Sequence, residues 1–182
     1  MDRIIKTDLY RYQGLTGFKG FLKGLLIPGF RYTYLMRKVA GHKKFSLPGL
    51  FYRLLKQRYT YKYGFQIPSS TQIGEGFYIG HFGSIVINGR VTIGNYCNIA
   101  HGVTLGQVNR GKMKGYPVIG NYVWIGTNAV IVGGVKIGNN VLIAPNTYLN
   151  TDVPDNSIVI GNPAKIIQKD NPVDGYIVYI LE

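Results

Sequence analysis

Aliphatic residues recur at every sixth position over the second half of the chain, and this period constrains the possible fold more than any other feature. Neither the period of an α-helix nor the two-residue alternation of a strand produces a repeat of six. A solenoid does, because each hexapeptide gives one short strand and one corner, and three hexapeptides complete a triangular coil. The repeating positions are Ile87, Ile93, Ile99, Leu105, Ile119, Ile125, Ile131, Ile137, Ile143 and Leu149. The sequence therefore predicts a mainly β, parallel β-helix.

Small or β-branched residues stand four places after most of these aliphatic residues, and glycine often follows the aliphatic residue directly. Such glycines suit corners, because they adopt backbone angles that other residues avoid. Cys97 occupies one of the small inward positions, so we interpret it as a core residue rather than a nucleophile. A single cysteine excludes a disulfide framework and favours a reducing compartment, which predicts a cytoplasmic protein.

Residues 1–64 lack the hexapeptide register and hold nearly all of the net charge. They carry 14 lysines and arginines against two acids, so they contribute +12 of the formal +13. Aromatic and aliphatic residues mixed with Lys and Arg predict short amphipathic helices, with Pro28 and Pro48 opening or ending them. These helices would cap the open first coil of the solenoid, and they could also present a basic face to the inner side of a membrane. Nucleic-acid binding is not expected, because no recognisable reading motif accompanies the charge.

Two interruptions of the register mark the candidate site, since departures from a repeat often carry function. The first adds two residues between Ile79 and Ile87, at a corner that holds His81. The second is a projecting, positively charged loop at residues 107–116. His81 and His101 each follow an aliphatic core residue by two places, and their spacing equals one coil plus the two extra residues. The spacing predicts that both histidines lie on the same corner of successive coils.

Three stretches resemble the hexapeptide-repeat acyltransferases. They are HGVTLG at residues 101–106, PVIGNYVWIG at 117–126 and DVPDNSIVIGNPA at 152–164. Within that family the chain is most similar to the serine acetyltransferase-like branch and its relatives that acetylate surface polysaccharides. The resemblance covers roughly residues 66–168 and implies a left-handed coil, a homotrimer with active sites between subunits, and acetyl-CoA as co-substrate. With it, the sequence predicts a helical region at residues 1–64, a β-helix at 65–168 and a C-terminal tail at 169–182.

The resemblance also implies roles for individual residues. His81 matches the catalytic histidine, which would take the proton from an attacking hydroxyl, as a histidine titrating near neutrality can. His101 is a second catalytic candidate that would tune the base, contact substrate or merely fill the corner. Phe82 and Tyr116 are candidate acceptor contacts. The candidate acetyl-CoA contacts, for which corner geometry alone is the alternative explanation, are Gly106, Gly126, Thr127, Ala144, Pro145 and Lys165, the last as a charge partner for a phosphate.

The match fails where serine would be bound. Gly80 and Gln66 stand where the family has aspartates, and Gly115 and Tyr116 replace the arginine–histidine pair that grips the substrate carboxylate. An amino acid zwitterion needs matched charges, whereas a sugar hydroxyl does not. We therefore expect O-acetylation of a sugar in a surface polysaccharide or its lipid-linked precursor.

Serine O-acetylation and a non-enzymatic scaffold remain the alternatives. A metal site is not expected, because only three histidines exist and His42 lies outside the repeats.

Overall fold

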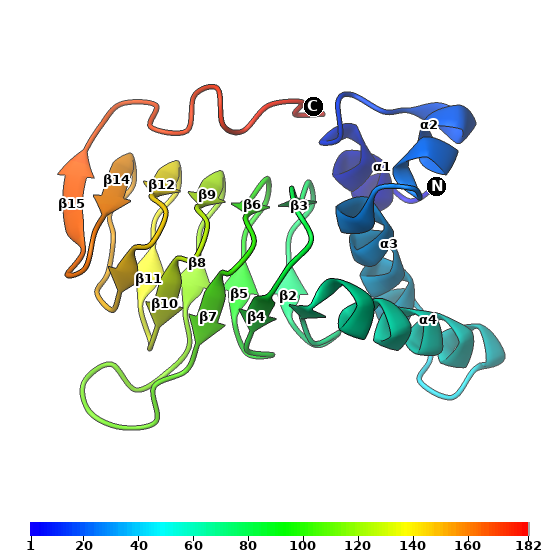
Figure 1. The fold of residues 1–182 in the computed structure, drawn as a ribbon, viewed down its shortest axis with the longest axis horizontal. Coiled ribbons are helices and arrows are strands. Elements are labelled where there is room, and N and C mark those ends of the chain that lie inside the picture. The colour runs from blue at the N-terminus through cyan, green and yellow to red at the C-terminus, as the bar shows by residue number, and fades with distance from the viewer. Residues whose placement is uncertain (182) are drawn as a thin grey trace.

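The computed structural model describes residues 1–181 and has the predicted architecture, a parallel β-helix with helices at its N-terminal end (Figure 1). Consecutive strands belong to three different sheets, and each strand pairs with the strand one coil further along the chain. The pairing is parallel throughout, apart from the last strand. Each coil therefore contributes one short strand to each side of a triangular solenoid.

The strands fall into three sets, which we call sheets A, B and C. Sheet A contains β1 (Phe65–Gln66), β4 (Ile85–Ile87), β7 (Thr104–Gly106), β10 (Val130–Val132) and β13 (Tyr148–Leu149). Sheet B contains β2 (Gln72–Ile73), β5 (Thr92–Ile93), β8 (Val118–Ile119) and β11 (Lys136–Ile137). Sheet C contains β3 (Tyr78–Ile79), β6 (Asn98–Ile99), β9 (Val123–Ile125), β12 (Val141–Ile143), β14 (Ser157–Ile160) and the antiparallel β15 (Lys165–Gln168).

The hexapeptide register forms the core. Every aliphatic residue of the register between Ile87 and Leu149 is 3% exposed or less. Cys97 is 1% exposed and lies in the same cluster, as its inward position predicts. Stacking these side chains coil upon coil buries a continuous apolar column, and this burial is the main force that stabilises a solenoid.

The corner between sheets B and C is closed by a ladder of side-chain oxygens. The backbone N–H of Asn95 donates to Oδ1 of Asn121, that of Asn121 to Asn139, and that of Asn139 to Asp155, at 2.7–2.8 Å. Each oxygen thereby satisfies a corner N–H that no strand can pair. The ladder holds successive coils at one spacing along this edge.

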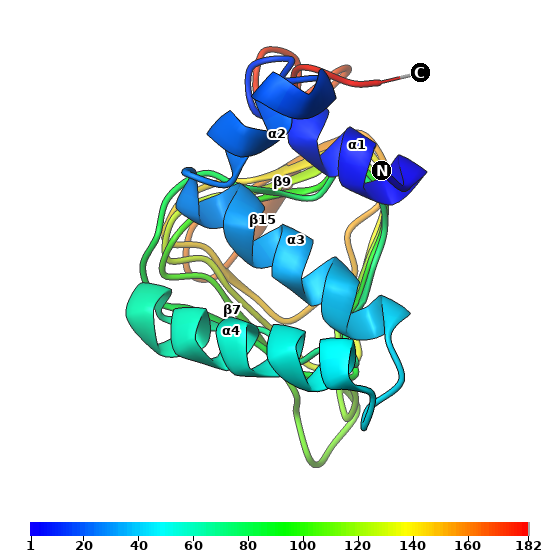
Figure 2. The same ribbon diagram turned by 90° about the vertical axis from the view of Figure 1, so that its right-hand side faces the viewer.

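Four helices precede the solenoid: α1 (Arg3–Tyr10), α2 (Gly17–Gly24), α3 (Pro28–Gly41) and α4 (Leu47–Tyr63). Pro28 opens α3 and Pro48 lies in the first turn of α4, as expected. Helix α3 crosses the open end of the first coil (Figure 2), where the Tyr32 ring lies 5.1 Å from that of Phe65. The Tyr32 hydroxyl also donates to the Phe65 carbonyl at 2.8 Å. The helices therefore act as the expected cap.

A buried ion pair fastens this cap to the solenoid. The Asp8 carboxylate accepts from the Arg37 guanidinium at 2.9 Å and from the backbone N–H of Phe77. Arg37 also donates to the carbonyls of Ile73 and Gly74. Burial raises the pKa of the Asp8 carboxyl, and the neighbouring Arg37 charge opposes that rise.

The C-terminal tail runs back along sheet C to the helical end of the molecule (Figure 1). Val173 and Ile177 pack against Tyr96 and Leu142, and the Tyr176 ring lies 4.9 Å from that of Trp124. This return could not be predicted from the sequence, because the tail has neither the hexapeptide register nor helical periodicity.

Candidate active site

His81 and His101 meet at the corner between sheets C and A. Their strands pair with Ile79 opposite Ile99, so the histidines occupy equivalent positions of successive coils. Their ring centroids lie 5.9 Å apart, with 89° between the ring planes. His81 is exposed and His101 is half-buried. The geometric prediction from their spacing is therefore confirmed.

The two extra residues at this corner create a bulge in which Gly83 adopts a backbone conformation that other residues rarely take. Gly83 adopts φ +140°, and a Cβ added to it would lie 3.1 Å from the Cβ of His101. Its N–H donates to the Tyr63 carbonyl at 3.0 Å, which ties the corner to the end of α4. Gly102 has φ +75° and faces the Asn128 side chain of the next coil. The position of His101 thus depends on Gly83 and Gly102, because neighbouring atoms lie close to where a side chain at either position would be.

Within residues 1–181, neither histidine forms a hydrogen bond or ion pair with a carboxylate. The nearest acid in sequence, Glu75, is paired with Arg3 at 3.2 Å instead. Nδ1 of His101 is buried and has no hydrogen-bond partner among the described atoms. Buried polar groups normally have a hydrogen-bond partner, so this nitrogen is available to bond substrate, water or a second copy of the chain.

Four of the predicted acetyl-CoA contacts share the histidine corner. Ile125 pairs with Ile99 and Ile143 with Ile125, which places Thr127 and Pro145 above His101 on the next two coils. Gly126 and Ala144 precede them. A Cβ added to Gly126 would lie 2.7 Å from the Pro145 nitrogen, so the two coils approach closely here. Gly126 is buried, so the accessible edge beyond the histidines consists of Thr127, Ala144 and Pro145, along which an extended chain could lie.

The remaining predicted contacts lie elsewhere in the single chain. Gly106 ends β7, so it lies at the opposite end of sheet A from the histidine corner. Tyr116 lies at that same far corner, where its hydroxyl accepts from Arg90 at 2.9 Å. Lys165 begins the terminal strand β15 and is exposed. Phe82, by contrast, follows His81 directly and is 67% exposed.

The charged loop at residues 107–116 projects from the same far corner (Figure 1). Val108 and Gly115 bridge its two ends, and the Gly134 N–H donates to the Met113 carbonyl at 2.9 Å. The loop is thus ordered against the following coil, while Arg110, Lys112 and Lys114 remain available to an anionic ligand.

A small cavity of about 300 Å³ begins beside the histidine corner, where Gly80 forms part of its wall. Arg11, Tyr78 and Tyr176 also line it. Arg11 is buried and donates to the carbonyls of Gly76 and Val178 and to Oδ1 of Asn98. Sequence reasoning missed this wall, because it is assembled from α1, sheet C and the tail, which no local pattern relates.

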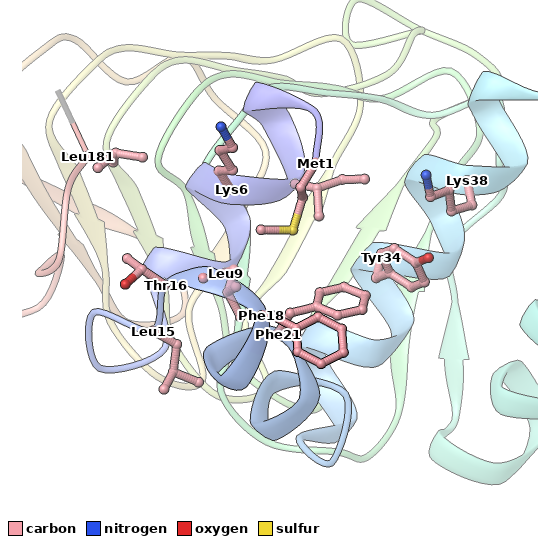
Figure 3. A pocket seen from close by; sticks show the side chains of 12 residues that line it. Met1, Lys6, Leu9, Leu15, Thr16, Phe18, Phe21, Tyr34, Lys38 and Leu181 are labelled. Atoms are coloured by element: carbon pink, nitrogen blue, oxygen red, sulfur yellow. The ribbon is translucent and has the colours of Figure 1, made fainter.

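A cavity of about 750 Å³ lies among the helices rather than beside the histidines. Figure 3 shows its apolar wall, which includes Leu9, Phe21 and Tyr34, and the side chains of Lys6 and Lys38. In the part of the chain that the structure describes, no group of three or more His, Cys, Asp or Glu residues could hold a metal ion.

The stacked coils and their hexapeptide register place the chain in the hexapeptide-repeat class of transferases. The family profile described as "Bacterial transferase hexapeptide (six repeats)" matches residues 116–151. The chain is 36% identical over 118 residues to the serine acetyltransferase of Helicobacter pylori, which covers 65% of this chain and 69% of that one. It is 32% identical over 145 residues to the enzyme of the same name from Synechococcus elongatus, covering 80% of this chain and 59% of that one.

Solved structures agree with the sequence relatives. The serine acetyltransferase of Neisseria gonorrhoeae superposes with a TM-score of 0.74 at 29% identity, covering 92% of this chain and 65% of that chain. A complex of the Brucella abortus serine acetyltransferase with coenzyme A gives a TM-score of 0.75 at 25% identity, covering 92% and 67%. The chain belongs to the serine acetyltransferase family of hexapeptide-repeat transferases. It spans about two thirds of the length of these structures, and none of the four supports the polysaccharide branch that the sequence departures favoured.

Proposed function

We propose that this protein is an acetyl-CoA-dependent O-acetyltransferase in which His81 is the general base. The observation that carries the proposal is the pair of histidines at the bulged corner, one exposed and one directly behind it with an unpartnered ring nitrogen. An exposed imidazole at an interrupted coil has the chemistry that acyl transfer to a hydroxyl requires.

The reaction would proceed by direct attack. The acceptor oxygen bonds to the thioester carbonyl carbon while His81 takes the hydroxyl proton. The resulting tetrahedral intermediate collapses by breaking the carbon–sulfur bond, and the protonated His81 returns its proton to the departing thiolate. His101 would position the His81 ring or contact the acceptor, since its own ring lies perpendicular to it.

Acetyl-CoA would lie along the edge that continues from the histidines through Thr127 and Pro145. The bound coenzyme A in the Brucella relative supports this choice of donor. Thr127 and Ala144 are half-buried and Pro145 is exposed, so these small side chains would line the path of the pantetheine chain. Lys165, exposed at the last coil, would pair with a phosphate of the donor.

A homotrimer would complete the site. Gly106, Tyr116 and the charged loop lie at the far end of sheet A from His81, so one chain cannot bring all the predicted contacts together. A neighbouring copy that presents its loop corner to the histidine corner would do so. It could also supply the partner that Nδ1 of His101 lacks.

Serine is the first acceptor to test, because the relatives are named serine acetyltransferases. A sugar hydroxyl is the second, and one specific observation favours it. Neither histidine has a carboxylate partner within residues 1–181, and Gly80 and Gln66 offer none at the positions where the resembled family has aspartates. The aromatic side chains of Tyr78 and Phe82 beside the corner suit a sugar ring better than an ammonium group.

The test is thiol release from acetyl-CoA with L-serine and with a panel of sugars. Turnover should require both acetyl-CoA and an acceptor. A matched variant, Gly80→Asp, separates the acceptors because it puts an acid beside the base. The nearest atoms to the new Cβ belong to the Tyr78 ring, the closest at 3.2 Å.

Turnover of serine by the native protein supports serine acetylation. Sugar turnover by the native protein, with serine turnover appearing only in Gly80→Asp, supports the sugar acceptor. The absence of thiol release with every acceptor would count against the enzyme and favour a scaffold.

A further inference from the structure

Helix α4 exposes large apolar side chains on the face that points away from the protein. The face that packs on the body holds Gly49, Lys56 and Tyr63. Lys56 is 9% exposed and donates to the Ile67 carbonyl at 2.7 Å. On the opposite face, Leu47 is 84% exposed and Leu54 is 72% exposed. A surface helix of a soluble domain normally has the reverse arrangement.

The exposed apolar residues lie on one face of the helix, and we call them the α4 stripe. Its members recur three, four or seven positions apart, the spacing that keeps side chains on one helix face. The stripe consists of Leu47, Leu50, Phe51, Leu54 and Tyr61, with Phe45 just before the helix. Figure 2 shows α4 lying along the outside of the molecule, so no other described element covers this face.

Positive charge accompanies the stripe, and negative charge is absent from its surroundings in the chain. Lys43 and Lys44 precede α4, and Arg58 and Lys62 lie near its end, all four exposed. No acid occurs between Asp8 and Glu75. Helix α2 repeats the combination, with Phe18 exposed beside Lys19.

We propose that the α4 stripe docks on an anionic lipid bilayer. Aromatic and aliphatic side chains would enter the headgroup boundary, while the flanking lysines and arginines contact lipid phosphates. Charge selects this occupant over a symmetric contact between the stripes of two copies, because that contact would bring like charges together. The helix would then lie in the membrane plane. Within residues 1–181, no helix has the length and apolarity that a crossing requires.

Vesicle co-sedimentation of the full chain tests the proposal. The vesicles contain either phosphatidylcholine alone or phosphatidylcholine mixed with phosphatidylglycerol. The test variant is Leu47→Ser with Leu54→Ser, and the matched control is Gln57→Ser, which changes an exposed polar residue of the same helix. A second variant, Lys43→Gln with Lys44→Gln, removes charge and leaves the stripe intact. Light scattering after size-exclusion chromatography gives the mass of each assembly.

We expect the native chain to bind the anionic vesicles only. The serine pair should reduce this binding at least about tenfold, and the glutamine pair or added salt should weaken it. Gln57→Ser should leave it unchanged. Assembly mass should stay constant across the set. No binding of the native chain to anionic vesicles would overturn the proposal. So would a fall in assembly mass in the serine pair with vesicle binding unchanged, because the stripe would then be a contact between copies.

Discussion

The imidazole of His101 lies close to that of His81, and the space beside its Cβ is open because Gly83 has no side chain. A Cβ on Gly83 would lie 3.1 Å from the Cβ of His101, and the two ring centroids are 5.9 Å apart. The geometry of the candidate base therefore depends on a residue that takes no part in the chemistry.

Replacing Gly83 with alanine should lower turnover by about tenfold or more, because small displacements of catalytic groups are costly. The added methyl displaces His101 and strains a backbone with φ +140°. Gly175→Ala is the matched control, since Gly175 also has a positive φ, +73°, but meets nothing within 4 Å and lies in the tail. Each substitution should cost about 1–3 kcal/mol of stability in thermal unfolding. Equal turnover of the two variants would show that His101 does not position the base.

Lys165→Ala should raise the KM for acetyl-CoA about two- to fivefold and leave kcat unchanged, because an exposed charge pair contributes little beyond binding. The difference from the native protein should shrink as salt is added. Lys169→Ala removes an exposed lysine from just beyond the same strand and serves as the control. Equal KM values for the two variants would remove Lys165 from the donor site.

Cys97 should resist alkylation in the native protein at neutral pH. Burial raises the pKa of its thiol to about 12, so almost no thiolate exists there. Iodoacetamide labelling should be negligible in buffer and complete in denaturant, as mass spectrometry would measure. Rapid labelling of the native chain with turnover lost in step would contradict the assignment of Cys97 to the core.

The hexapeptide period predicted the solenoid because an aliphatic residue must be buried at the same position of every coil. One such residue is a weak indication of structure, but its repetition over many coils is a strong one. It also predicted the meeting of His81 and His101, since coil length converts sequence spacing into position. Tyr96 and Tyr122 show where residue type misleads. Both occupy left-handed corners, at φ +54° and +55°, where glycine or asparagine is expected. The two rings stack with their centroids 5.4 Å apart, and this contact offsets the cost of the left-handed backbone. It exists only once the coils are stacked, so the sequence of one coil does not predict it.

Long-range contacts between irregular segments were beyond prediction. The wall that Arg11 and Tyr176 form beside Gly80 joins residues from opposite ends of the chain, and no periodicity connects them. The outward stripe of α4 was hidden for another reason. A helical pattern reports which residues share a face but not which face the body covers. The choice of acceptor depends on the charges around the His81 corner. A neighbouring copy would add charges there that the sequence of one chain does not place.

Removing the imidazole of His81 is the decisive measurement. Thiol release from acetyl-CoA should be compared for the native protein, His81→Ala and His42→Ala, with the acceptor that the native protein uses. His42 follows α3, outside the solenoid, where its ring bonds the Lys38 carbonyl, so its loss should leave turnover unchanged. His81→Ala should lower kcat by at least about a hundredfold, the contribution of a general base. Native turnover in His81→Ala, with folding intact, would contradict the assignment of the base and move the chemistry away from this corner.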